Sequence, residues 1–158
     1  MPCISQRGRS AGFGIVEVLV ALVVLAVGML GIAGLYVTTL RASNGAIYRT
    51  LAVNLAADMA DRIRANPRAG TAYENAPADR GCVAGAGDCN RQAMAEDDLF
   101  HWAAELQAAL PDDGNAGTPQ GTVTVDEALA PLRTYTITVT WVEPSELQPL
   151  IYTLRMQT

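Results

Sequence analysis

The sequence contains no lysine, a single histidine (His101) and only three cysteines among its 158 residues. All eleven of its basic residues are arginines, and its formal net charge at pH 7 is −5. An acidic chain repels a phosphate backbone unless its few positive charges cluster. We therefore expect no nucleic-acid partner.

Recognisable catalytic motifs are also missing. The chain shows no Gly-x-Ser-x-Gly, no phosphate-binding loop, no Cys–His pairing and no cluster of metal ligands. His101 has no candidate nucleophile or second metal ligand at a readable spacing, so we expect a surface side chain there. The sequence predicts no enzymatic activity, no cofactor and no metal. A membrane-anchored periplasmic enzyme or ligand-binding module remains an alternative.

Apolar residues are abundant, but they are concentrated in one stretch. From Phe13 to Val37 the only charged side chain is Glu17, and roughly 20 apolar residues suffice to cross a bilayer as a helix. Arg7 and Arg9 precede this stretch and favour a cytoplasmic N-terminus. Residues 13–37 are thus predicted to span the inner membrane once and to leave the C-terminal part in the periplasm.

Small residues occur before the apolar stretch, not after it as in an ordinary secretory signal. They are Ser10, Ala11 and Gly12. Cleavage there would leave the anchor on the mature protein. It would also remove two arginines and no acid, which takes the net charge from −5 to −7. Residues 1–12 are predicted to be a leader.

The segment Gly12-Phe13-Gly14-Ile15-Val16-Glu17 resembles the prepilin processing motif of the type IV pilin family. The resemblance implies cleavage between Gly12 and Phe13 by a prepilin peptidase, which also methylates the amine of Phe13, and a role in assembly for Glu17. It further implies three kinds of partner: other major and minor pilins, the peptidase/methyltransferase and an inner-membrane assembly platform. The mature chain would end in a cell-surface pilus. The competing interpretation is a simple signal anchor whose Glu17 reaches up to water.

Physical chemistry independently suggests a role for Glu17. A carboxylate near the membrane core costs roughly 2.5 to 3.5 kcal/mol unless it is paired. The N-terminal ammonium of a neighbouring subunit would be a natural partner, and the pair would set axial register.

Beyond Val37, apolar residues recur every four positions, and Asn66-Pro67 is the next stop signal. The recurring residues are Ile47, Leu51, Leu55, Met59 and Ile63. We predict one helix from about Phe13 to Ala65, whose amphipathic half (residues 38–66) packs mostly on the chain's own sheet. Residues 59–67 resemble the same segment of the pilus-modification minor pilins of the PilV type. Asp58 and Arg62 are predicted to form a charge pair.

Residues 67–158 are predicted to form a globular head that begins with a loop containing Cys82 and Cys89. Cys3 leaves with the leader, and in an oxidising periplasm a bridge between the remaining pair contributes roughly 2.5 kcal/mol. A metal site is the rival interpretation of this pair. A second helix is expected from about Arg91 to Leu110, with Asp97 and Asp98 as capping or solvated acids.

The C-terminal third alternates with period two, which predicts three antiparallel strands. The turns are expected at Ala130-Pro131 and at Glu143-Pro144-Ser145. The predicted fold class is α+β: a long N-terminal helix packed on a small antiparallel sheet, with a second helix in the connecting loop. The pilin resemblance implies the same architecture. A minor pseudopilin of a type II secretion system shares the motif and stays an alternative.

Overall fold

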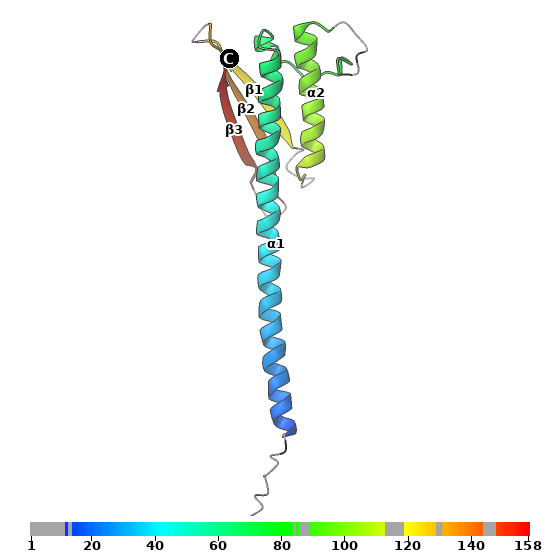
Figure 1. Cartoon of the computed structure of the whole chain (residues 1–158), viewed down its shortest axis with the longest axis vertical. Helices are drawn as coiled ribbons and strands as arrows, with labels where there is room; N and C mark the ends of the chain where they lie inside the picture. The colour runs from blue at the N-terminus through cyan, green and yellow to red at the C-terminus, as the bar shows by residue number, and fades with distance from the viewer. Residues whose placement is uncertain are drawn as a thin grey trace, which may run out of the picture. The chain divides into compact units, whose positions relative to one another are not determined.

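The computed structural model describes residues 12, 14–83, 85, 89–112, 119–128, 131–143 and 148–158. The expected leader up to residue 11, Phe13 and the turn residues Ala130, Pro144 and Ser145 lie outside this part of the chain. The element order is α1 (Ile15–Ala65), η1 (Gly70–Glu74), α2 (Arg91–Ala109), β1 (Gln120–Asp126), β2 (Thr134–Trp141) and β3 (Leu150–Gln157) (Figure 1). The chain divides into two units, Met1–Ala42 and Ser43–Thr158.

Helix α1 is 51 residues long and ends at Ala65, as the Asn66-Pro67 signal predicts. Its threonine hydroxyls are satisfied within the helix: Thr38 and Thr39 both donate to the carbonyl oxygen of Leu35, at 2.8 and 2.9 Å, and Thr50 donates to that of Ala46 at 2.9 Å. This back-bonding lets polar residues continue the helix without exposing unpaired donors.

The C-terminal part of α1 supplies one face of the head's core. Its buried side chains are Ala52, Ala56, Met59, Ala60 and Ile63. Alanines at three of these positions leave room for neighbouring elements to approach the helix backbone closely. Figure 1 shows this part of the helix beside α2 and the sheet.

The predicted four-residue stripe holds for four of its five residues, with Leu51 among them as a partly buried side chain, and it fails at Ile47. Met59 and Ile63 are fully buried and Leu55 is partly buried, but Ile47 is 52% exposed. A four-residue step advances about 40° around a helix of 3.6 residues per turn. Four such steps separate Ile47 from Ile63, so Ile47 has turned away from the face that Ile63 buries.

The sheet is antiparallel with strand order β1-β2-β3. Val123 of β1 pairs with Ile137 of β2, which pairs with Leu154 of β3. On β2 the apolar residues that alternate with threonines are buried, namely Tyr135, Ile137, Val139 and Trp141. The predicted α+β architecture with three antiparallel strands is confirmed.

Helix α2 begins after Asn90, whose side-chain oxygen accepts a hydrogen bond from the backbone N–H of Ala93 at 2.8 Å. Its buried face holds Trp102, whose indole N–H donates to the carbonyl oxygen of Leu55 in α1 at 2.9 Å. On β1, Gly121 lies so close to the Trp102 ring that a Cβ there would overlap it. One tryptophan therefore joins α2 to both α1 and the sheet.

The short helix η1 covers the edge of β1. Gly70 begins it with a positive φ of 57°, a conformation that favours glycine. The hydroxyl of Tyr73 lies 3.0 Å from Asp98 Oδ2, and Glu74 Oε1 accepts from the backbone N–H of Val125 at 2.7 Å. The edge strand β1 thus receives a partner for one of its outward N–H groups.

Candidate processing site and disulfide loop

The segment before α1 is open to solvent. Gly12 and Gly14 are both exposed, and apart from the adjoining residues of the chain no atom lies within 4 Å of the position that a Cβ would take at either residue. The backbone N–H groups of Glu17 and Val18 donate to the carbonyl oxygen of Gly14, at 3.0 and 3.3 Å, and start the helix. Phe13, the other residue of the predicted cleavage site, lies outside the described residues.

Glu17 lies in the first turn of α1 and is exposed. The free N–H groups and the macrodipole of a helix N-terminus favour a negative charge at this position. Within the described part of the chain, the Glu17 carboxylate has no ion-pair partner.

The N-terminal part of α1 has the character of a membrane span. An 18-residue window has a mean hydropathy of 2.8, and none of it is buried in the structure. Large apolar side chains are exposed all around this part of the helix. Their exposed fractions run from 45% at Val18 to 81% at Ile15. A helix that is apolar on every side needs a protein core or a lipid bilayer around it.

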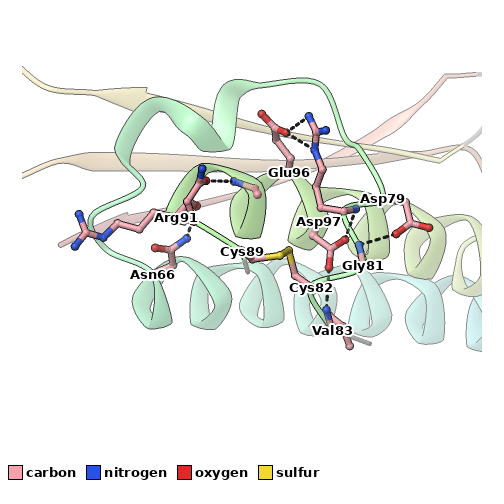
Figure 2. Close-up of a disulfide and its surroundings, with 12 residues drawn as sticks. Asn66, Asp79, Gly81, Cys82, Val83, Cys89, Arg91, Glu96 and Asp97 are labelled. Atoms are coloured by element: carbon pink, nitrogen blue, oxygen red, sulfur yellow. Dashed lines mark hydrogen bonds and ion pairs between the residues drawn. A yellow bond between two sulfur atoms is a disulfide. The ribbon is translucent and has the colours of Figure 1, made fainter. Parts of the chain in front are cut away.

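In the head, Cys82 and Cys89 form the expected disulfide, with their Cα atoms 5.8 Å apart. The buried carboxylate of Asp97 holds the loop beside it: Oδ1 accepts from the backbone N–H of Arg80 at 2.7 Å, and Oδ2 from that of Val83 at 3.2 Å. Figure 2 shows Asp97 and the disulfide on the same side of α2. The loop is therefore tied to the helix by both a covalent bond and an acid.

Glu96 provides a second attachment for this loop. Its Oε2 accepts from the Arg80 guanidinium at 2.8 Å, and its Oε1 accepts from the amide groups of Gln92 at 2.9 Å and Asn75 at 3.1 Å. These hydrogen bonds, from Gln92 first and then Arg80, hold the pKa of Glu96 below its ordinary value.

The environments of Asp97 and Asp98 shift their pKa values in opposite directions. Burial is the largest single influence and acts to raise the pKa of Asp97, but the backbone N–H groups of Arg80, Val83 and Gly81 together with His101 outweigh it, and the net pKa is lowered. For Asp98 burial prevails and raises the pKa, although Tyr73 and Arg62 act against it.

The expectation that Asp97 and Asp98 are capping or solvated acids is wrong, because their exposed fractions are 0% and 9%. The N-cap is Asn90 instead, and the loop covers the N-terminal half of α2. A signal was available in the sequence. A Gly- and Ala-rich loop brings many backbone N–H groups and few side-chain acceptors, so acids on the helix to which it is tied become their acceptors.

The predicted pair between Asp58 and Arg62 is present, with Arg62 Nε 2.8 Å from Asp58 Oδ2. The same guanidinium also reaches Glu105 of α2 at 2.9 and 3.1 Å. What the sequence suggested as a local pair on one helix is therefore also a link between two helices.

The described residues offer little support for a metal site or for catalysis by His101. No group of three or more His, Cys, Asp or Glu side chains among them could hold a metal ion. His101 is partly exposed, and its Nε2 lies 3.7 Å from Asp97 Oδ2. Glu96 and Asp97 accept hydrogen bonds from the loop, and Asp98 accepts one from Tyr73 of η1, which is the arrangement of a structural cluster.

Two family models match the chain in adjacent segments. The prokaryotic N-terminal methylation motif matches residues 7–33, and the model of type IV pilin Tt1218 matches residues 34–100. Searches among curated proteins and solved structures gave no match. The motif, the apolar helix and the helix-on-sheet head agree with these two models. The chain therefore belongs to the type IV pilins, and its N-terminal helix is a single-pass anchor in the inner membrane before the protein joins a pilus.

Proposed function

We propose that this pilin is a minor structural subunit that takes part in pilus assembly, motility or adhesion without turnover of its own. The observation that carries the proposal is the motif from Gly12 to Glu17 placed directly before the apolar part of α1. The minor role rests on the resemblance of residues 59–67 to the PilV type.

We propose four segments along the chain: a leader (1–12), the membrane half of the helix (13–37), its amphipathic half (38–66) and a globular head (67–158).

The first step is cleavage between Gly12 and Phe13 by the prepilin peptidase, followed by methylation of the Phe13 amine. A peptidase needs exposed backbone, and the open surroundings of Gly12 and Gly14 support this requirement. Helix α1 begins only at Ile15, so the proposed bond precedes the regular hydrogen bonding of the helix.

The second step is assembly with other pilins at the inner-membrane platform. In the proposed contact, the Glu17 carboxylate pairs with the N-terminal ammonium of a neighbouring subunit. In a medium of low dielectric constant, leaving one charge of such a pair alone is strongly unfavourable. A subunit that inserts one residue out of register would leave the Glu17 carboxylate without its ammonium partner. The pair therefore favours a single axial position.

The cleavage experiment compares Gly12→Leu with Gly8→Leu, the same substitution four residues upstream in the leader. We expect the Gly12 variant to accumulate at full length in membranes, while the Gly8 variant and the parent protein begin at methylated Phe13. Mass spectrometry of the purified N-terminus measures both. A parent protein that begins at Met1, or beyond the apolar stretch, would contradict the proposed processing.

A minor pseudopilin of a type II secretion system is the second candidate, because it carries the same processing motif. A deletion strain separates the two functions. Loss of twitching motility with normal enzyme secretion supports the pilus role, and the reverse result supports the pseudopilin role.

A further inference from the structure

A hollow of about 400 Å³ opens on the head between η1 and the beginning of α2. Its lining residues are Arg68, Ala69, Thr71, Ala72, Asn75, Arg91 and Gln92. They come from the segment that follows α1, from η1 and the residue after it, and from the first turn of α2. No acidic residue lines the hollow.

Two positive charges meet here without a carboxylate partner. Two other arginines of the head are neutralised: Arg80 pairs with Glu96, and Arg133 with Glu127. Among the described residues, the guanidinium groups of Arg68 and Arg91 form no ion pair. In a chain of net charge −5, a hollow lined by two unpaired arginines has a locally positive potential.

The neutral part of the lining is suited to hydroxyl groups. The Asn75 and Gln92 amides donate to Glu96 at 3.1 and 2.9 Å, which fixes their orientation and leaves their carbonyl oxygens as acceptors. Thr71 adds a hydroxyl group, and the two alanines add small apolar surface. Glu96 itself is paired with Arg80, so its charge is largely compensated.

The dimensions indicate a ligand larger than a simple ion. A volume of about 400 Å³ is several times that of inorganic phosphate, and it falls in the usual range of small-molecule sites. Arginine recognises carboxylate and phosphate through paired N–H donors. The first turn of α2 adds the partial positive charge of a helix N-terminus.

We propose that this hollow binds an acidic sugar. The anionic group contacts Arg68 and Arg91, and the sugar hydroxyls contact Thr71, Asn75 and Gln92. The shared chemistry is an oxyanion carried on a pyranose ring, either as a carboxylate or as a phosphate. The site is independent of cleavage and of Glu17, and it would give the head a ligand in addition to its pilin partners.

The test uses the full mature chain in micelles of a polyoxyethylene detergent, which carries neither charge nor sugar. Glucuronate, glucose 6-phosphate, inorganic phosphate and glucose are titrated separately while amide NMR signals are followed. Saturable shifts at η1 and the start of α2 are expected with at least one acidic sugar, and at least tenfold weaker binding is expected for glucose and for phosphate. Whichever acidic sugar binds more tightly identifies the anionic group.

Two variants complete the experiment. Arg68→Gln combined with Arg91→Gln should weaken binding at least tenfold, whereas Arg155→Gln, an exposed arginine on β3, should leave it unchanged. The thermal unfolding of each variant shows that the head remains folded. The absence of saturable shifts with both acidic sugars would overturn the proposal. So would equal affinity for glucose or for phosphate, or equal weakening by Arg155→Gln.

Discussion

The two parts of helix α1 differ in what surrounds their apolar side chains. In Ile15–Ala42 the large apolar residues are exposed on every side, whereas the part that begins at Ser43 buries three alanines, Met59 and Ile63 in the head. Hydropathy alone identifies the first part, because lipid accepts any apolar face. The second part depends on shape, because a protein core accepts only side chains that fit.

Glu17→Ala gives the largest expected effect and acts on the first part only. We expect cleavage and membrane insertion to persist while filament incorporation fails, because a buried charge left without its partner costs about 3 to 5 kcal/mol. Immunoblots of membranes and of sheared filaments measure the two pools. Glu17→Gln should fail in the same way, and normal amounts of it in filaments would show that charge pairing is not what Glu17 supplies.

Removing the disulfide acts on the second part only. Cys82→Ser combined with Cys89→Ser should lower the stability of the head by about 2.5 kcal/mol on the chain-entropy model and leave the helicity of the anchor unchanged. Denaturant unfolding followed by near-UV circular dichroism measures the loss. Free-thiol labelling of both cysteines in protein from unreduced cells would contradict the presence of the bond in vivo.

The same substitution in both parts sharpens the comparison. Gly121→Ala should destabilise the head by about 1 to 3 kcal/mol, because the new Cβ overlaps the Trp102 ring. Gly31→Ala in the anchor meets no atom within 4 Å and should favour the helix by up to about 1 kcal/mol. Thermal unfolding of the two variants provides the comparison, and equal effects would mean that packing does not distinguish the two parts.

The smallest expected effect is the pH dependence of the head. Glu96 and Asp97 have lower pKa values in the folded chain, so the stability they contribute is present above about pH 4 and is lost as pH falls toward their folded-state values. The raised pKa of Asp98 acts oppositely: its contribution is present below about pH 4 and is lost as pH rises through the folded-state pKa.

The measurement compares urea unfolding of the parent chain and Asp97→Asn at pH 6 and pH 3. We expect the difference between them to shrink at the lower pH, because the Asp97 carboxyl of the unfolded chain is largely protonated there. Asp61→Asn is the control, because the Asp61 side chain is 73% exposed. A difference that stays constant with pH would rule out a role for the Asp97 charge.

The sequence was sufficient for features that depend on local signals. Period two predicted which faces of β2 are buried, and Asn66-Pro67 predicted the end of α1. It was insufficient where distant segments meet. Asp97 looks solvated until the loop that ends at Cys89 covers it. The hollow between η1 and α2 depends on the same kind of long-range contact.

Because the Trp102 indole donates to the Leu55 carbonyl, its fluorescence reports whether α2 is packed against α1. A buried indole that donates to a helix carbonyl emits at shorter wavelength than one in water, so its fluorescence follows the attachment of α2 to α1. The second buried tryptophan, Trp141, lies on the sheet. With Trp141→Phe, the remaining signal comes from Trp102 alone. Trp102 fluorescence then follows the separation of α1 and α2, while circular dichroism follows the loss of the sheet.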